Sequence, residues 1–165
     1  MKTYPPIKTI RSLLDYDPDT GIFRWKIRGR GRRKSKIAGH ITKRGYITIE
    51  TNHNQFRAHR LAWYITYGYL PKELDHINRN KSDNRICNLR ECSSSENGAN
   101  RESYRVGKYK GVCFCKRHKK YLSQIGYNNK LYFLGYFDTP ELAALAYNAK
   151  ALELYGEFAY LNEVE

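Results

Sequence analysis

The chain has 165 residues, 41% of them apolar and 14% aromatic, which predicts packed cores in one ordinary domain or in about two or three small ones. Its formal net charge of +14 favours a polyanionic partner, because Lys and Arg side chains that neutralise phosphates release condensed counterions. Aromatic residues interleaved with the basic ones favour nucleic acid over an anionic membrane surface, and the sequence has no basic amphipathic helix of the membrane-surface kind.

The expected compartment is the cytoplasm. No run of 18 apolar residues occurs, so we expect no membrane span, and MKTYPPIKTIRSLL lacks the pattern of a signal peptide. The four cysteines, at positions 87, 92, 113 and 115, are therefore expected to be reduced thiols. A zinc site is an open alternative, although C-x4-C followed by C-x-C departs from the usual ligand spacing.

The first third of the chain combines a short helix with strands. Residues 7–16 (IKTIRSLLDY) have the apolar spacing of a helix, and DPDTG after them is a turn. Residues 21–27 (GIFRWKI) alternate in the manner of a strand, and residues 39–63 hold further β-type runs around turn residues.

A basic tract lies between these β segments, at residues 24–36 (RWKIRGRGRRKSK), with eight Lys or Arg and no acid. Its glycines favour a loop, and contact with phosphates is a better interpretation than a merely solvated tract. The expected DNA-binding residues here are Arg28, Arg30, Arg32 and Arg33.

The middle of the chain predicts a helix followed by a strand, a loop, a second strand and a second helix. Residues 58–68 (AHRLAWYITYG) carry an apolar stripe, with Gly68 as the terminator. ELDHI is then extended, NRNKSDNR is a loop by composition, and ICNLREC is a strand. The next helix opens with a serine N-cap and Glu96, the pattern of a capping box.

Asp75 and His76 stand side by side in the first of these strands. Phosphodiester hydrolysis needs a base that deprotonates water, and histidine has a suitable pKa. A hard cation such as Mg²⁺ prefers oxygen ligands and often takes only one or two from the protein. Because neighbouring residues of a strand point to opposite faces, Asp75 and His76 can serve one site only if the backbone is irregular near residue 76.

The amide ligand of such a cation is not chosen by composition, because asparagines stand at positions 78, 80, 84, 88 and 97. The segment LDHINRNKSDNRICNLRECSSSENGANR, with the preceding AHRLAW, resembles the HNH homing-endonuclease family of phage and intron-encoded proteins. The resemblance implies a ββα-metal (His-Me finger) core of two strands and a helix around one divalent ion.

On this resemblance His76 is the general base, Asn88 holds the loop and orients the histidine, and Asp75 and Asn97 bind the metal. Asn97 stands where other members carry histidine, which makes the chain an H-N-N variant. A neutral amide oxygen suits a hard ion, so Mg²⁺ or Mn²⁺ is expected rather than Zn²⁺. The remaining loop residues (Asn78, Asn80, Asp83 and Asn84) are typical turn formers, and His59 is more often a packing residue than a member of a site.

The C-terminal third starts a new pattern after RESYRVG, an expected linker. Three strands follow, YKGVCFC, KYLSQIGY and KLYFLGYF. A helix then begins with Thr139 as N-cap and Pro140 as its first residue, and ends before Gly156. Positions 142, 145, 146, 149 and 152 form its apolar face, and we expect the helix to pack on the sheet.

This third of the chain resembles the AP2 DNA-binding domain in its YKGV, in KLYFLGYFDTPELAALAYN and in the closing G-x-x-A-x-LN. The resemblance implies a three-stranded sheet that enters the major groove, with a helix behind it. Plant members carry arginines and tryptophans on the sheet, and this chain does not, so their target sequence is not carried over. The expected DNA contacts, with a solvated basic hairpin as the alternative, are Lys110, Lys116, Arg117, Lys119, Lys120 and Tyr121.

The expected fold class is α+β, with a ββα-metal nuclease core (57–104) between a basic β-rich module (1–56) and an AP2-like module (105–165). We expect a monomeric HNH endonuclease of the homing type, with one Mg²⁺ or Mn²⁺ per site. It would nick double-stranded DNA to 5′-phosphate and 3′-hydroxyl ends, in the cytoplasm of a bacterial host or phage-infected cell, without an obligate protein partner. The alternatives are a sequence-specific DNA-binding regulator with an inactive core and a protein that binds structured RNA.

Overall fold

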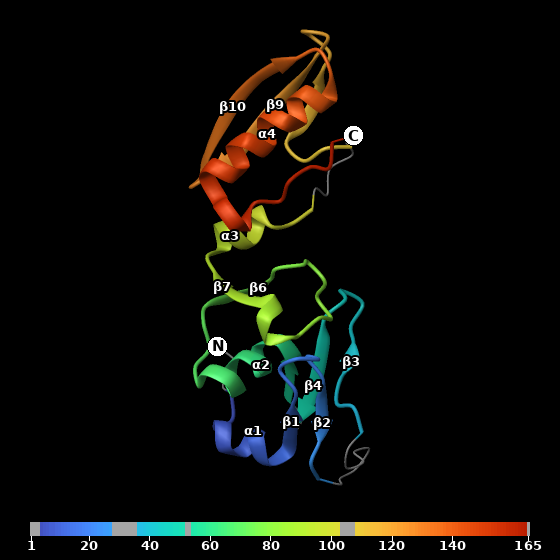
Figure 1. The fold of residues 1–165 in the computed structure, drawn as a ribbon, viewed down its shortest axis with the longest axis vertical. Coiled ribbons are helices and arrows are strands. Elements are labelled where there is room, and N and C mark those ends of the chain that lie inside the picture. The colour runs from blue at the N-terminus through green and yellow to red at the C-terminus, as the bar shows by residue number, and fades with distance from the viewer. Residues whose placement is uncertain (1–3, 28–35, 52–53, 103–107, 165) are drawn as a thin grey trace. The chain divides into compact units, whose positions relative to one another are not determined.

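The computed structural model describes residues 4–27, 36–51, 54–102 and 108–164 (Figure 1). It is a mixed α/β structure built from small sheets and helices. Its internal contacts divide the chain into two units, residues 1–91 and residues 92–165. The first two modules expected from the sequence therefore share one unit, up to residue 91, and the three-module division stays a prediction.

The first unit begins with α1 (Ile7–Leu13), β1 (Leu14–Tyr16) and β2 (Phe23–Trp25). The predicted helix is shorter than expected, because its last three residues pair with β2 in an antiparallel hairpin that places Leu14 opposite Trp25. The alternation in β1 explains this difference: Leu14 is buried, and Asp15 between it and Tyr16 is exposed. The predicted turn DPDTG joins the two strands.

The core of the first unit lies between these elements, a three-stranded sheet and a helix. The sheet has the order β3 (His40–Ile41), β4 (Ile47–Thr51), β5 (Asn54–Arg57), and α2 (Ala58–Tyr67) follows directly. Leu61 and Ala62 of α2 pack with Ile49 and Phe56 of the sheet and are almost fully buried. The helix ends where the sequence predicts, at Gly68, which takes the left-handed conformation with φ +83°.

The expected strand–loop–strand–helix order follows in the structure. It consists of β6 (Glu73–His76), a 3₁₀ turn (Ile86–Asn88), β7 (Leu89–Cys92) and α3 (Ser94–Ala99), and β6 pairs with β7. The capping box is confirmed: the hydroxyl of Ser93 accepts from the backbone N–H of Glu96, whose carboxylate accepts from the backbone of Ser93. The boundary between the two units falls within β7, so α3 is described with the second unit.

The second unit contains one antiparallel sheet, in the order β10 (Lys130–Phe137), β9 (Lys120–Tyr127), β8 (Val112–Cys115). Figure 1 shows α4 (Pro140–Tyr155) lying across this sheet, and a 3₁₀ turn (Gly156–Phe158) after it. Thr139 caps the helix by accepting from the backbone N–H of Leu142, as the sequence predicts.

The face of α4 that packs on the sheet is not the predicted one. Leu142, Leu145 and Leu152 are each about half exposed (49%, 51% and 51%), whereas the buried residues are Ala143, Ala144, Tyr147 and Ala151. Both sides of this helix are apolar, so periodicity could not separate them. The sheet selects the alanine side because small side chains permit close approach; a Cβ on Gly111 of the neighbouring chain segment would lie 2.1 Å from the ring of Tyr147.

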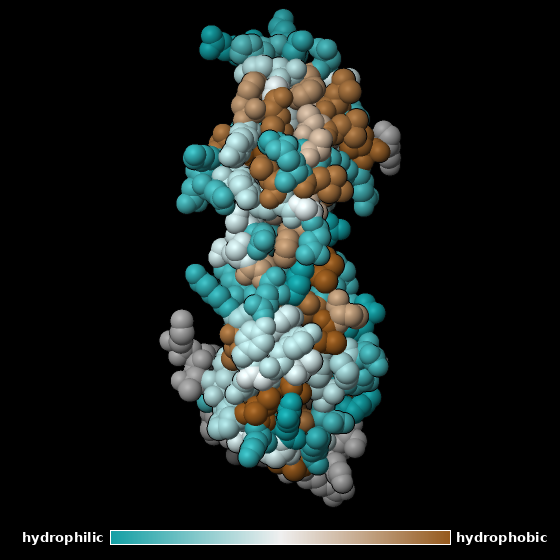
Figure 2. All heavy atoms as spheres, turned by 60° about the vertical axis from the view of Figure 1, so that its left-hand side comes forward, coloured by the Kyte–Doolittle hydropathy of each residue, from teal (hydrophilic) through white to brown (hydrophobic). Residues whose placement is uncertain are grey.

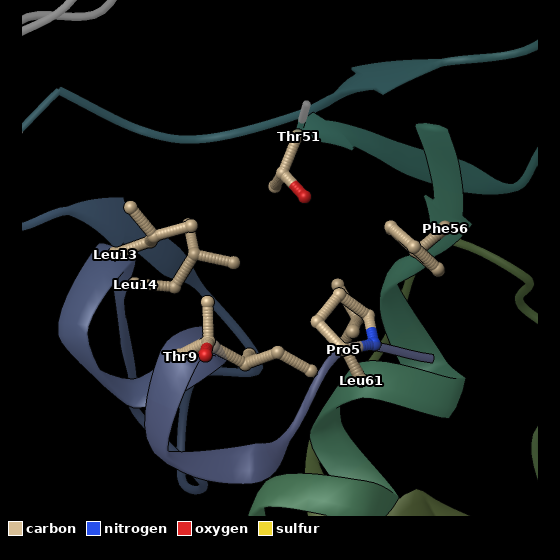
Figure 3. Close-up of a pocket in the computed structure, with 8 residues that line it drawn as sticks. Pro5, Thr9, Leu13, Leu14, Thr51, Phe56 and Leu61 are labelled. Atoms are coloured by element: carbon tan, nitrogen blue, oxygen red, sulfur yellow. The ribbon is translucent and has the colours of Figure 1, made fainter. Parts of the chain in front are cut away.

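The structure also has exposed hydrophobic side chains on the second unit and an apolar pocket in the first unit. Hydrophobic side chains reach the surface of the second unit beside hydrophilic ones (Figure 2), including three leucines of α4. A pocket between α1, α2 and the adjoining strands is lined by Leu13, Leu14, Phe56 and Leu61, with Pro5, Thr9, Ile10 and Thr51 (Figure 3). This pocket is a gap in apolar packing without a charged group, so it offers no catalytic chemistry. Among the described residues, no helix is long and apolar enough to cross a membrane.

Candidate active site

His76 is the last residue of β6 and is buried, with 5% of its surface exposed. Its ring meets that of His59, from α2, edge to face at 4.8 Å between centroids. It also lies 6.1 Å from the ring of Tyr46, which precedes β4. The strand ends at His76, which agrees with the irregular backbone expected there, and Asp75 beside it is buried as well.

Burial lowers the pKa of His76 below its ordinary value of 6.5, because desolvation penalises the imidazolium. The side chain of Asn84 and the charges of Asp75 and Asp83 oppose this effect by favouring the charged form. The net direction keeps the imidazole neutral at neutral pH, which is the form that accepts a proton.

His59 is a second buried histidine, only 4% exposed. Burial lowers its pKa to about 2, so it carries no charge beside His76 at any ordinary pH. Among the described residues its Nδ1 has no hydrogen-bond partner. The sequence favoured a packing role for His59, and the structure brings it into contact with the ring predicted to be the general base.

Asp75 is held by a buried ion pair with Arg90 of β7. The Nε and Nη2 atoms of Arg90 both donate to Oδ2 of Asp75, at 3.2 and 3.0 Å. The two side chains are only 11% and 8% exposed, so this pair is largely removed from water. Arg90 therefore fixes the orientation of the carboxylate.

Asn88 ties together the loop that follows His76. Its side-chain oxygen accepts from the backbone N–H of Asn78 at 2.9 Å, and its side-chain nitrogen donates to Oδ1 of Asn78 and to the carbonyl of Asp83, both at 2.9 Å. Its carbonyl accepts from the backbone N–H of Ile77 at 2.9 Å. These bonds hold the loop whose first residues follow the histidine, which is the geometry of a loop-holding residue.

Asn84 has a role that the sequence pattern does not single out, because a turn-rich loop contains several equivalent asparagines. Its side chain is 1% exposed and faces His76, where it favours the charged imidazole. The phenol of Tyr16 donates to its carbonyl at 2.8 Å. A Cβ at Gly21, which has φ +71°, would lie 2.5 Å from the backbone nitrogen of Arg85 and 2.6 Å from the carbonyl carbon of Asn84. The hairpin turn near the N-terminus therefore supports the loop after His76.

Two cations lie on the Tyr46 ring that contacts both histidines. The guanidinium of Arg57 lies 4.5 Å from the ring centroid and the ammonium of Lys81 lies 5.3 Å from it. These residues come from three separate parts of the chain, so no local motif could have grouped them. They place positive charge in the neighbourhood of His76.

Asn97, the predicted metal ligand, lies on α3 and is half-buried. Its backbone N–H donates to the carbonyl of Ser93 at 2.9 Å, which is the first hydrogen bond of that helix. It is described with the second unit, and Asp75 and His76 with the first. Within the described chain, no group of three or more His, Cys, Asp or Glu could hold a metal ion.

The predicted DNA-binding residues occupy different settings. Lys116, Arg117 and Lys119 are exposed in the turn between β8 and β9, and Lys120 lies 3.1 Å from Asp138. The ammonium of Lys110 donates to the carbonyls of Ala99 and Arg101 at 2.5 and 2.6 Å, so it ties the end of α3 to the sheet module. Tyr121 packs against Phe114 at 5.2 Å. The remaining predicted residues, Arg28, Arg30, Arg32 and Arg33, lie outside the described residues.

Comparison with known proteins identifies the family of the chain. The model of the HNH endonuclease family matches residues 56–99, a segment that contains Asp75, His76, Asn88 and Asn97. An uncharacterized HNH endonuclease of Acanthamoeba polyphaga mimivirus is 30% identical over 134 residues, which cover 79% of this chain and 70% of that protein. The chain belongs to the HNH endonuclease family. This membership implies a nuclease that acts on DNA and, as is general among HNH nucleases, the use of a divalent metal ion.

The family match defines where the recognisable nuclease segment begins and ends in this chain. It begins at Phe56, at the end of β5, and ends at Ala99, the last residue of α3. The segment therefore includes α2 with His59 as well as the two strands and the helix of the predicted core. The AP2-like module lies beyond it, and the resemblance of that module stays a prediction.

Proposed function

We propose that this HNH endonuclease is a metal-dependent enzyme that nicks double-stranded DNA, with His76 as the general base. The observation that supports this proposal most directly is the buried histidine at the end of β6, which is neutral and lies next to a carboxylate in a fixed orientation. Homing-type activity and monomeric action, as expected from the sequence, belong to the same proposal.

His76 removes the proton from the water that attacks the scissile phosphate. The loop bonds of Asn88 and the ring contact of His59 hold the imidazole in one position, so little orientation is lost when substrate binds. Arg57 and Lys81 attract the phosphate toward this part of the surface. The 3′-hydroxyl and 5′-phosphate ends follow if the 3′ oxygen is the leaving group.

The donor chemistry fits a hard divalent ion, Mg²⁺ or Mn²⁺. We assign the carboxylate of Asp75 and the amide oxygen of Asn97 as its protein ligands, with water and phosphate completing the coordination. Arg90 holds this carboxylate through its two bonds to Oδ2 of Asp75, so the proposed ligand has a fixed orientation. When bound, the ion would stabilise the charge that develops on the phosphate and on the departing oxygen.

The test is incubation of purified protein with supercoiled plasmid and Mg²⁺, with product ends determined by ligation and phosphatase sensitivity. We expect nicked circles from the wild type, and a loss of about 10²–10⁴ in rate for His76→Ala with DNA binding retained. His40→Ala is the matched control, since His40 is an exposed histidine of the same unit. Full activity of His76→Ala, or an absence of nicking with every divalent ion, would exclude the proposal.

Two variants of Asn97 test its proposed role as a metal ligand. Asn97→Asp keeps an oxygen at the position and is expected to retain nicking with Mg²⁺ or Mn²⁺, whereas Asn97→Ala is expected to lose it. Equal activity of the two variants would remove Asn97 from the metal site.

The two alternatives make different predictions in the same assay. A DNA-binding regulator with an inactive core would bind duplex DNA without nicking it, and its affinity would not change with His76→Ala. An RNA-binding protein would prefer a structured RNA competitor over duplex DNA at equal ionic strength. A linear plasmid as the first product would indicate a dimer that cuts both strands.

A further inference from the structure

The sheet of the second unit has two faces of different chemistry. Tyr147 and Ala151 of α4 pack against Ile125 on one face. Residues alternate between faces along a strand, so the cross-strand register places the neighbours of Ile125 on the opposite face. We name this opposite side, which α4 does not cover, the uncovered face; the register assigns to it Cys113, Cys115, Lys120, Leu122, Gln124, Gly126, Leu131, Phe133 and Tyr136.

Large apolar side chains are exposed on the uncovered face. Leu131 is 68% exposed, Phe133 57% and Tyr136 39%, and the rings of Phe133 and Tyr136 are 5.1 Å apart. A sheet that merely faces water carries polar residues on that side. Adjacent exposed apolar side chains instead mark a surface that contacts a partner.

The charges of this unit indicate the kind of partner. Residues 108–137, which contain the three strands, hold seven Lys or Arg and no acid. Residues 138–165, which contain α4, hold six acids and one Lys. Lys116, Arg117 and Lys119 stand exposed at the turn beside the uncovered face. The sheet side is therefore complementary to a polyanion and the helix side is not.

The register also places a polar amide side chain, that of Gln124, among the apolar residues. Gln124 of β9 lies directly opposite Phe133 of β10. Leu131 lies two residues before Phe133 on β10 and is on the same face. A two-stranded ribbon of this kind fits the major groove of DNA. There, a glutamine amide pairs with the N6 and N7 atoms of adenine, and apolar side chains contact the one apolar group in the groove, the C5-methyl of thymine.

We propose that the uncovered face reads A·T pairs in the major groove, with Leu131 and Phe133 on thymine methyl groups and Gln124 on adenine. The basic turn binds the flanking phosphates and holds the ribbon in the groove. This inference rests on the proposed function, in which the chain acts on duplex DNA, and adds to it the base composition of the bound site.

The test replaces thymine by uracil, which removes only the methyl group. Full-length His76→Ala protein, which should bind DNA without cutting it, first selects duplexes from a random library at 150 mM salt. Fluorescence anisotropy then compares each selected duplex with its uracil-substituted copy. We expect A·T pairs at the selected positions and a loss of about fourfold in affinity for each contacted methyl group.

Surface variants assign the effect to the face. Leu131→Ser and Phe133→Ser are introduced together into the His76→Ala protein. This variant is expected to bind thymine and uracil duplexes with equal affinity. Both side chains are exposed, so the fold should tolerate the changes. Leu142→Ser is the matched control, since Leu142 is a comparably exposed leucine on the helix side of the same unit, and it should keep the difference.

The outcomes separate this inference from the proposed function. Equal affinity for thymine and uracil duplexes, or discrimination that survives Leu131→Ser with Phe133→Ser, would overturn the base-reading role while leaving nicking intact. Self-association that disappears in the double variant would assign the face to a second copy of the chain and also overturn it. A plasmid that is never nicked would instead remove the proposed function.

Discussion

The contact between the N-terminal turn and the loop after His76 predicts that Gly21→Ala damages the candidate active site from a distance. Gly21 has φ +71°, and a Cβ there would lie 2.5 Å from the nitrogen of Arg85 and 2.6 Å from the carbonyl carbon of Asn84. Backbone atoms cannot turn aside as a side chain does, so the loop itself has to move.

The magnitude follows from two separate costs. A non-glycine residue in the left-handed region costs about 1–2 kcal/mol, and overpacking against well-packed atoms adds about 1–3 kcal/mol. Gly21→Ala should therefore lower the free energy of unfolding by about 2–5 kcal/mol. Gly68 isolates the first cost, because its φ is +83° and nothing lies within 4 Å of its Cβ position. Gly68→Ala should lose only about 1–2 kcal/mol.

Urea denaturation followed by tryptophan fluorescence measures both variants in the relevant unit, since both tryptophans, Trp25 and Trp63, belong to residues 1–91. Plasmid nicking under conditions where each variant is folded gives the second measurement. We expect Gly21→Ala to nick more slowly than Gly68→Ala. Equal destabilisation and equal nicking of the two variants would refute the close approach of the turn to the loop.

Three further predictions concern the buried polar groups of the first unit. Arg90→Met removes the cation that pairs with the buried carboxylate of Asp75, and should lower the free energy of unfolding by about 3–5 kcal/mol in urea denaturation. Asn88→Ala removes three loop hydrogen bonds, so the backbone amide of Asn78 should exchange hydrogen faster and the free energy of unfolding should fall by about 1–3 kcal/mol. Unchanged exchange at Asn78 would contradict the loop-holding role of Asn88. The pKa of His59 falls from 6.5 to about 2 on folding, so the unfolded state binds the proton more tightly and stability is lost as pH falls below 6.5. Between pH 7 and pH 5 the wild type should lose about 2 kcal/mol more than His59→Gln, and parallel pH profiles would show that His59 is not buried as described.

The local signals of this sequence predicted the structure well. The Ser93–Glu96 capping box, Gly68 as a terminator, and Thr139 with Pro140 all act within one turn of the chain, so their residues are sufficient to specify them. The position of His76 at a strand end could be argued from the need to bring Asp75 to the same site.

Other parts depend on partners that are distant in the sequence. The face of α4 that packs was predicted wrongly because leucines occupy one side and alanines the other, and only the sheet decides between them. The neighbours of His76, namely His59, Tyr46 and Asn84, come from different elements, and nothing in their spacing marks the contact. Tertiary packing, which no local pattern contains, brings them together.

The support that Tyr16 and Gly21 give to the loop has a consequence for how such nucleases are rearranged. The family match begins at Phe56, well after both residues, so the matched segment does not contain all the residues that support its own loop. A fragment trimmed to that segment would lose the turn on which the loop rests. We expect successful chimaeras to transfer residues 14–25 and 73–92 from the same parent, and to join foreign sequence after the nuclease segment instead of before it.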